Sequence, residues 1–354
     1  MDTTKDAVFR ALRTVNYPGF SRDIVSFGLV HGVLMEGTTA RIGLVTAALP
    51  QEIQQEIAEA VSRVVRTVPG VKDVLLQIGK PPQSKKVRTG APTPEEIPGI
   101  LHVLAVASGK GGVGKSTIAV NLAATLAKSG LRVGLLDADI HGPNVPRMLG
   151  LKHLPPAENG KILPAEAYGI KVMSLAFAGD DAPAIWRGPM IDKAIQQFLS
   201  DVFWGKLDVL VVDLPPGTGD AQLSLTQRIP VDGAIIVSTP QLVALDDARK
   251  GIAMFQKVGV PVLGLVENMS HFRCPDCGGV HYIFGQGGAA ALAAELNLPL
   301  LAEIPLEPLV REDGDSGFPA ALDPNSHTRR AFFGLAEAVS DRLGIFQAIP
   351  EVMQ

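Results

Sequence analysis

A loop rich in glycine and lysine, set between two apolar segments, carries the clearest chemical pattern in the chain. Gly109, Gly114, Lys115 and Ser116 have the spacing G-x-x-x-x-G-K-[ST] of a phosphate-binding loop. Backbone N–H groups of such a loop hold a polyphosphate, the lysine neutralises the outer phosphates, and the hydroxyl binds Mg²⁺. We therefore predict a nucleotide site with Ser116 as the Mg²⁺ ligand, formed by Gly109, Lys110, Gly111, Gly112, Val113, Gly114, Lys115, Ser116 and Thr117.

Aspartates follow two further apolar runs that have the composition of buried strands. Asp137 and Asp139 come directly after residues 133–136, and Asp213 follows residues 209–212. Carboxylates at strand ends beside a phosphate loop suit Mg²⁺ bound through water and the alignment of an attacking water molecule. Gly217, shortly after Asp213, offers a backbone amide that can sense a γ-phosphate.

The only two cysteines of the chain, Cys274 and Cys277, form a Cys-x-x-Cys pair. Two thiolates at this spacing can chelate one soft metal centre, but zinc and iron-sulfur clusters commonly take four ligands. A two-fold dimer would bring two such pairs together and supply four thiolates. A zinc site within one chain, completed by His271 and His281, is the alternative interpretation.

Composition limits the functional classes. The chain has 354 residues, a net charge of −4 and a pI near 6.0, which argues against a large nucleic-acid footprint. No apolar run approaches the ~18 residues that indicate a membrane span, and residues 1–15 lack the apolar core of a signal peptide. We expect a cytoplasmic protein with no membrane or nucleic-acid partner.

The order of the apolar patterns predicts two domains joined by a linker. Residues 1–79 alternate as helix, two strands, helix and strand, which predicts a small α+β domain of α-β-β-α-β order. Residues 80–99 are rich in proline and basic residues and predict a solvated linker. Residues 100–354 alternate strands and helices, and several strands are continuous apolar runs. This predicts a doubly wound, mostly parallel α/β sheet that binds its ligand at the carboxyl ends of the strands.

Lys110, five positions before Lys115, makes the loop similar to the deviant Walker A loop of the MinD, ParA and nitrogenase-iron-protein class of P-loop ATPases. That resemblance implies ATP as the nucleotide and a homodimer in which Lys110 reaches the nucleotide of the partner subunit. It further implies that Asp137 is the metal-side carboxylate, that Asp139 positions water and that Asp213 is the Walker B residue. Asn268, expected at the end of a third strand, is implied to face adenine.

Within that class the chain resembles the Mrp/ApbC family of iron-sulfur cluster carriers. The resemblance rests on Lys110, the DLPPG stretch at 213–217, the ENMS stretch at 267–270 and the CPDC stretch at 274–277. It implies a labile 4Fe-4S cluster bridged between two subunits by Cys274 and Cys277, received from a donor scaffold and passed to apo-proteins. ATP binding and slow hydrolysis, with Lys110, Lys115 and Asp139 as the catalytic residues, are implied to be required for delivery. The first domain resembles the small N-terminal domain of SufT-like assembly proteins.

Two other functions share parts of this pattern. A MinD/ParA-like positioning ATPase with a structural zinc knuckle would need a basic surface or a terminal amphipathic anchor. The tail at residues 328–346 instead has the apolar face of a helix that covers a core. Electron transfer, as in the nitrogenase iron protein, shares the loop and the dimer but not a close Cys-x-x-Cys pair.

Overall fold

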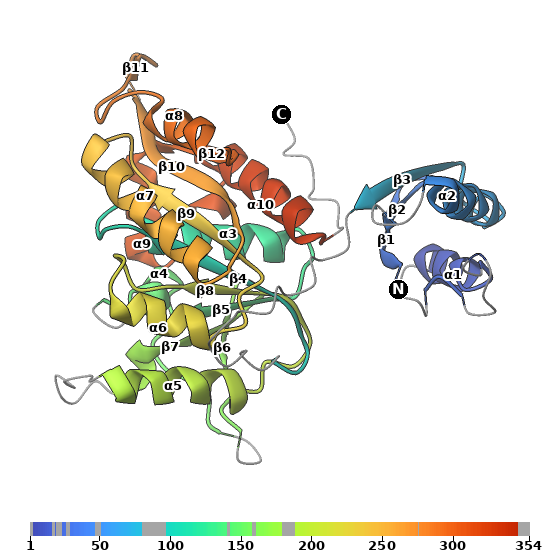
Figure 1. Ribbon diagram of the computed structural model, residues 1–354, viewed down its shortest axis with the longest axis horizontal. Coiled ribbons are helices and arrows are strands. Elements are labelled where there is room, and N and C mark those ends of the chain that lie inside the picture. The colour runs from blue at the N-terminus through green and yellow to red at the C-terminus, as the bar shows by residue number, and fades with distance from the viewer. Residues whose placement is uncertain are drawn as a thin grey trace. The chain divides into compact units, whose positions relative to one another are not determined.

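The computed structural model describes residues 3–15, 18, 23–25, 29–46, 51–79, 97–139, 142–157, 161–178, 188–274 and 276–345 (Figure 1). These residues fall into two compact units. Among the described residues, the smaller unit takes in 3–79 with 340–345, and the larger takes in 97–339. Most of the predicted linker at 80–99 lies outside the described residues, so each unit is presented by itself.

The smaller unit has the predicted order of elements. Its helices and strands are α1 (Thr3–Leu12), β1 (Val30–Glu36), β2 (Thr39–Val45), α2 (Gln51–Val65) and β3 (Asp73–Gly79). The sheet order is β1-β2-β3, with β1 antiparallel and β3 parallel to β2. Apolar side chains such as Leu12, Ile42 and Val61 are completely buried between sheet and helices. The first strand begins at Val30, and Ile24 before it lies in a turn.

The larger unit is built on a nine-stranded sheet within the described part of the chain, in the order β11-β10-β9-β4-β8-β5-β7-β6 with β12 beside β10. All neighbours are parallel except β6 with β7 and β10 with β11. The strands are β4 (Ile100–Ser108), β5 (Val133–Asp137), β6 (Ala165–Ala167), β7 (Ile170–Ser174), β8 (Leu207–Asp213), β9 (Gly233–Ser238), β10 (Val262–Arg273), β11 (Val280–His281) and β12 (Leu300–Leu306).

Helices cover both faces of this sheet, which confirms the predicted doubly wound α/β fold. Figure 1 shows α5, α6 and α7 in front of the sheet and α3 behind it. The helices are α3 (Lys115–Lys128), α4 (Val145–Met148), α5 (Gly188–Ser200), α6 (Asp220–Arg228), α7 (Leu242–Lys257), α8 (Gly288–Glu295), α9 (Pro308–Ser316) and α10 (Arg329–Leu343). Among the described residues, no helix is both long enough and apolar enough to cross a membrane.

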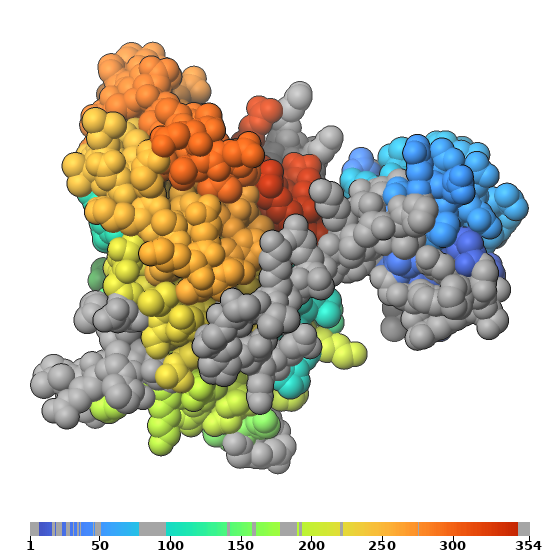
Figure 2. Space-filling view, viewed as in Figure 1, coloured from blue at the N-terminus to red at the C-terminus, as the bar shows by residue number. Residues whose placement is uncertain are grey.

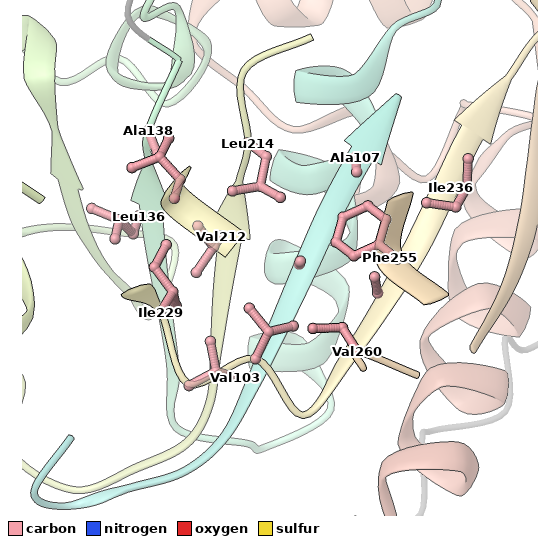
Figure 3. Packing of buried hydrophobic residues seen from close by; sticks show 14 of the residues in the cluster. Val103, Ala107, Leu136, Ala138, Val212, Leu214, Ile229, Ile236, Phe255 and Val260 are labelled. Carbon is pink, nitrogen blue, oxygen red and sulfur yellow. The ribbon is translucent and has the colours of Figure 1, made fainter. Parts of the chain in front are cut away.

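Alternate residues of each central strand pack against opposite helical layers. Val103, Val212 and Ile236 belong to the core beneath α5 to α8, where Phe255 of α7 is completely buried (Figure 3). Because β4, β5 and β8 are buried on both faces, their sequences are continuous apolar runs.

The strand order explains how distant residues meet. The neighbours β5, β8 and β4 end, respectively, in Asp137, in Asp213 and in the phosphate-binding loop. Since these strands are parallel, their carboxyl ends lie at the same edge of the sheet.

Candidate functional site

The phosphate-binding loop joins β4 to α3 and needs glycine for steric reasons. Gly112 and Gly114 have φ angles of +81° and +84°, a left-handed conformation that side chains disfavour. A Cβ atom on Gly114 would lie 2.1 Å from Nδ2 of Asn268, and one on Gly109 would lie 2.1 Å from the backbone of Asp247 in α7. The loop is therefore packed tightly between α7 and β10.

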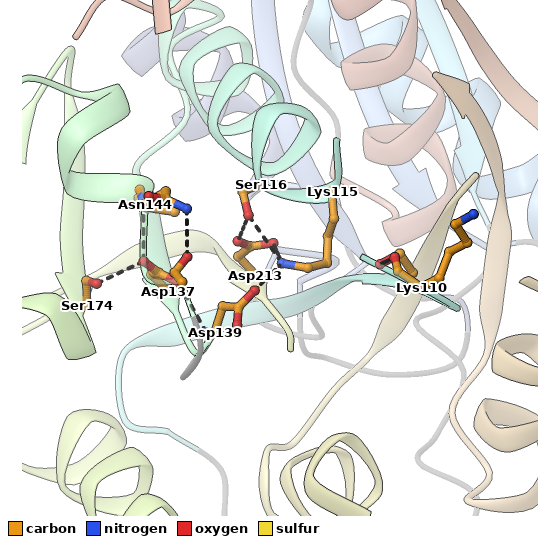
Figure 4. Close-up of polar contacts among 11 residues, drawn as sticks. Lys110, Lys115, Ser116, Asp137, Asp139, Asn144, Ser174 and Asp213 are labelled. Atoms are coloured by element: carbon orange, nitrogen blue, oxygen red, sulfur yellow. Dashed lines mark hydrogen bonds and ion pairs between the residues drawn. The ribbon is translucent and has the colours of Figure 1, made fainter. Parts of the chain in front are cut away.

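Lys115, the first residue of α3, is the centre of a buried polar cluster (Figure 4). Its Nζ lies 2.6 Å from a carboxylate oxygen of Asp213 and 3.6 Å from one of Asp139. Ser116 donates a hydrogen bond of 2.5 Å from its hydroxyl to the other oxygen of Asp213. The predicted lysine, serine and two of the three predicted aspartates are thus in direct contact.

Asp137, the third aspartate, lies opposite Asp213 in the register of β5 and β8. It accepts hydrogen bonds from the hydroxyl of Ser174 at 2.8 Å and from the backbone N–H groups of Asp139 and Val145. Burial, and then repulsion by Asp213, raise its pKa to about 7. Burial also raises the pKa of Asp213, against the opposing effect of Lys115.

The cluster contains three carboxylates and one ammonium group, and burial is the main reason that the pKa values of Asp137 and Asp213 are raised, with repulsion between carboxylates adding to it. A divalent cation beside the Ser116 hydroxyl and Asp213 would add positive charge and find the oxygen ligands that Mg²⁺ prefers. The donor set fits the predicted Mg²⁺.

A cavity of about 630 Å³ opens beside the cluster. Gly111, Gly112, Gly114, Lys115, Ser116 and Thr117 line one side, together with Ser108, Lys110 and Asp139. The cavity is of the size that ligand sites commonly have. Gly217, whose φ is +100°, adjoins the lining residue Pro216, and its N–H donates to the carbonyl of Ser108 at 3.0 Å.

The far wall of the cavity was not predicted from sequence. It comes from α4, from the end of β12 and from α9, and includes Met148, Pro305, Leu306, Val310 and Arg311. The signal that could have found it is the strand-end rule used for Asp137 and Asp213, because β12 is also a parallel strand whose carboxyl end lies at this edge.

Asn268 lines the cavity, but the expectation that it ends a strand is wrong. β10 continues to Arg273, and Asn268 is buried at 6% exposure with its Nδ2 donating to the carbonyl of Val113 at 2.9 Å. The side-chain amide therefore fastens the phosphate loop to β10. Its amide oxygen remains the group that suits an adenine amino group.

The side chain of Lys110 points away from Lys115 and Asp213 (Figure 4). Within the described residues its ammonium group forms no ion pair. Lys110 lines the cavity and is partly exposed.

The two cysteines lie in a tight loop between β10 and β11. The N–H of Cys274 donates to the carbonyl of Gly279, and the N–H of Gly278 donates back to Cys274, each at 2.9 Å. Hydrogen bonds from the backbone of Cys277 and Asp276 lower the pKa of the Cys274 thiol, so the loop favours the thiolate that binds metals. Cys274 is partly exposed and Cys277 is exposed, and neither forms a disulfide.

The zinc knuckle within one chain is not assembled. Cys277 Sγ and His281 Nε2 both lie near Gly279, within 3.4 Å of where its Cβ would be. His271 instead contacts Ser270 through its Nδ1. Across the part of the chain that the structure describes, no three His, Cys, Asp or Glu side chains are grouped to hold a metal ion.

The larger unit has the fold of a MinD ATPase, and its loop has the spacing of a P-loop protein. The MinD cell division ATPase of Pyrococcus furiosus, which is 24% identical, superposes over 68% of this chain and 98% of its own with a TM-score of 0.53. An ADP-bound nucleotide-binding protein of Archaeoglobus fulgidus, 42% identical, covers 62% of this chain and 88% of its own with a TM-score of 0.56.

Comparison of the sequence with known protein families identifies the family to which the chain belongs. Residues 99–340 match the family of NUBPL iron-transfer P-loop NTPases, and residues 5–76 match an iron-sulfur cluster assembly domain. The chain belongs to this family of iron-transfer P-loop NTPases. Relatives named iron-sulfur cluster carrier protein are 48% identical in Deinococcus radiodurans and 44% identical in Synechocystis sp., covering 96% and 97% of this chain and 96% and 98% of their own. An iron-sulfur carrier role in a P-loop NTPase family is thus supported, and the resemblance to cluster carriers is confirmed.

The buried carboxylates predict a pH-dependent stability of the nucleotide-free protein. Because the pKa of Asp137 is raised to about 7, the folded state holds a proton that the unfolded state loses near pH 4. The free energy of unfolding should therefore fall as pH rises from about 4 to 7, by at most about 1.4 kcal/mol per pH unit for one proton.

Thermal melting across this pH range tests the assignment. Asp137→Asn should flatten the dependence. Asp208→Asn should leave the slope between about pH 5 and 7 unchanged, because Arg132 lowers the pKa of Asp208 and that group is already ionised. An unaltered slope in Asp137→Asn would refute the role given to its burial.

Gly114→Ala should lower the melting temperature and weaken ADP binding about tenfold or more, because the added methyl group meets Asn268 at a left-handed backbone position. Gly111→Ala is the matched control, since its Cβ meets nothing within 4 Å and its φ is not in the left-handed range. Melting curves of the nucleotide-free variants separate the two, and equal melting temperatures would contradict the packing argument.

Proposed function

We propose that the protein is an ATP-dependent carrier that holds a 4Fe-4S cluster between two subunits and passes it to apo-proteins. The observation that carries the proposal is the course of β10. This one strand contacts the phosphate loop through Asn268 and leads, six residues later, into Cys274. One strand therefore connects the phosphate loop with the loop of Cys274 and Cys277, which we call the cargo site.

In this proposal the chain's own groups carry out ATP hydrolysis. Lys115 leaves the carboxylates to neutralise the β- and γ-phosphates, while the amides of the loop hold them. Asp139, 8% exposed beside Lys115, orients the attacking water. Ser116 and Asp213 would hold Mg²⁺, which would supply charge neutralisation at the phosphates. The amide of Gly217 turns from Ser108 to the γ-phosphate.

The cargo site requires a second copy of the chain. One subunit offers two thiolates, whereas a 4Fe-4S cluster takes four, so a two-fold axis beside the Cys274 loop completes the set. Exposed apolar side chains at this end support an interface there. Leu242 and Val243 of α7 are 79% and 66% exposed, and Tyr282 and Ile283 after β11 are 48% and 57% exposed.

These exposed residues lie together. A Cβ on Gly285 would be 3.6 Å from the carbonyl of Pro240, so the segments before α7 and after β11 are in contact. Figure 2 shows α7 and the β10–β11 hairpin side by side at one end of the unit. In the dimer, Lys110, which points away from its own Lys115, reaches the partner's nucleotide. A cytoplasmic setting, a donor scaffold and apo iron-sulfur proteins as recipients complete the proposal.

Mixed dimers test whether Lys110 acts across the interface. Lys110→Ala and Asp139→Ala should each abolish hydrolysis in homodimers, because each removes a group that stabilises the transferring phosphoryl group or its water. In a heterodimer of the two variants, action in trans places both defects in one active site and leaves the other site intact. ATPase assays should then recover about half of the wild-type rate, whereas no recovery after confirmed subunit exchange would show that Lys110 acts in its own subunit.

Cysteine variants test the cargo site separately. Cys274→Ser and Cys277→Ser should each lose bound iron and sulfide after anaerobic reconstitution and fail to activate an apo-ferredoxin, while retaining ATP hydrolysis. Lys115→Ala is the reciprocal control, which should keep the cluster and lose hydrolysis. Iron and sulfide near four per wild-type dimer support the carrier, and one zinc per chain that persists in a monomer would overturn it.

A further inference from the structure

A second cavity, of about 470 Å³, lies beside the cysteine loop, and three of its ten lining residues are arginines. It is formed where the ends of β10 and β12 meet the start of α10. Phe272 of β10 pairs with Leu306 of β12, which brings Arg273 and Glu307 to the same edge. Its lining residues are His271, Arg273, Pro305, Leu306, Glu307, Pro324, Ser326, His327, Arg329 and Arg330.

The charge of this cavity is unbalanced. Three arginines line it against one carboxylate, in a chain whose net charge is −4. That carboxylate, Glu307, is already used: it accepts hydrogen bonds from the hydroxyl of Ser326 at 2.8 Å and from the N–H groups of His327 and Thr328 at 3.1 Å. Glu307 therefore shapes the entry into α10 and does not pair with the arginines.

The three arginines of this cavity have N–H groups that are available to a ligand. Within the described residues, Arg273, Arg329 and Arg330 form no ion pair. Nε of Arg329 is buried with no hydrogen-bond acceptor, while its guanidinium lies 5.6 Å from the ring centroid of Phe333. A buried donor without an acceptor is destabilising, and repulsion among three cations adds to that. The amino end of α10 increases the positive potential further.

We propose that this cavity binds a small polyanion through its carboxylate or phosphate groups. Arginine forms paired hydrogen bonds with both kinds of group, and the volume lies within the range of small-ligand sites. The site is separate from the nucleotide cavity, although Pro305, Leu306 and Glu307 line both. Because Arg273 immediately precedes Cys274, a bound anion would hold the end of β10 from which the cysteine loop begins.

Isothermal titration calorimetry of the cluster-free protein, with the phosphate loop saturated by Mg-ADP, tests the proposal. The probes are tricarballylate, a tricarboxylate, and inorganic pyrophosphate, so that the two arms tell carboxylate from phosphate recognition. At least one should bind with one site per chain, and its affinity should fall with added salt. The measurement involves neither a cluster nor ATP hydrolysis, so its outcome is independent of the carrier proposal.

Substitutions of the arginines test whether the anion binds in this cavity. Arg273→Gln and Arg330→Gln should each weaken it about tenfold or more. Arg342→Gln, at the exposed opposite end of α10, should leave it unchanged. Arg329→Gln should weaken binding as well, and because this arginine packs on Phe333, its melting curve is compared with wild type first.

Three results would overturn the proposal. They are absence of binding by both anions at millimolar concentration, equal loss of affinity in Arg342→Gln, and binding of a hexaglutamate peptide without binding of either small anion. The last result would assign the cavity to an acidic segment of a partner protein instead.

Discussion

The hydrogen bond from Asn268 to the carbonyl of Val113 joins the phosphate loop to β10, the strand that leads into Cys274. It holds the phosphate loop against β10 so closely that residue 114 has no room for a side chain. After Asn268 the backbone of β10 is less regular. Met269 has a φ of +57°, and the pairing with β12 is irregular between Asn268 and Phe272. The strand is thus bound to the phosphate loop at Asn268, and its pairing with β12 is irregular before it reaches Cys274.

The second constraint is electrostatic. Parallel strands β5 and β8 place Asp137 and Asp213 opposite each other, buried, with Lys115 as the cation between Asp213 and Asp139. Burial, with repulsion between the carboxylates, raises the pKa values of Asp137 and Asp213. In the proposed function a Mg-nucleotide would add positive charge here through the ion, and its phosphates would bind the lysine.

Much of this organisation could be predicted from the order of residues. The alternation of continuous apolar runs with helical periodicity predicted the doubly wound sheet, because strands buried on both faces leave that pattern. Glycine at 112 and 114 and the lysine and serine after them predicted the phosphate loop, since the backbone conformation it needs excludes most side chains. The error at Asn268 has a physical origin. Polar residues after an apolar run suggest the end of a strand, yet β10 continues because β12 and β11 supply hydrogen-bond partners as far as Arg273.

The sequence by itself determined the local chemistry: which residues can hold phosphate, which can bind a soft metal, and which segments must be buried. These follow from side-chain type and from spacing along the chain. The tertiary structure alone decided which of these groups meet. It placed Asp213 rather than Asp137 against Ser116, brought the end of β12 and α9 across the nucleotide cavity, and gathered arginines from β10 and α10 around one hollow. Such contacts depend on the order of strands in the sheet. That order is set by packing between segments far apart in the chain, so it cannot be read from the spacing of neighbouring residues.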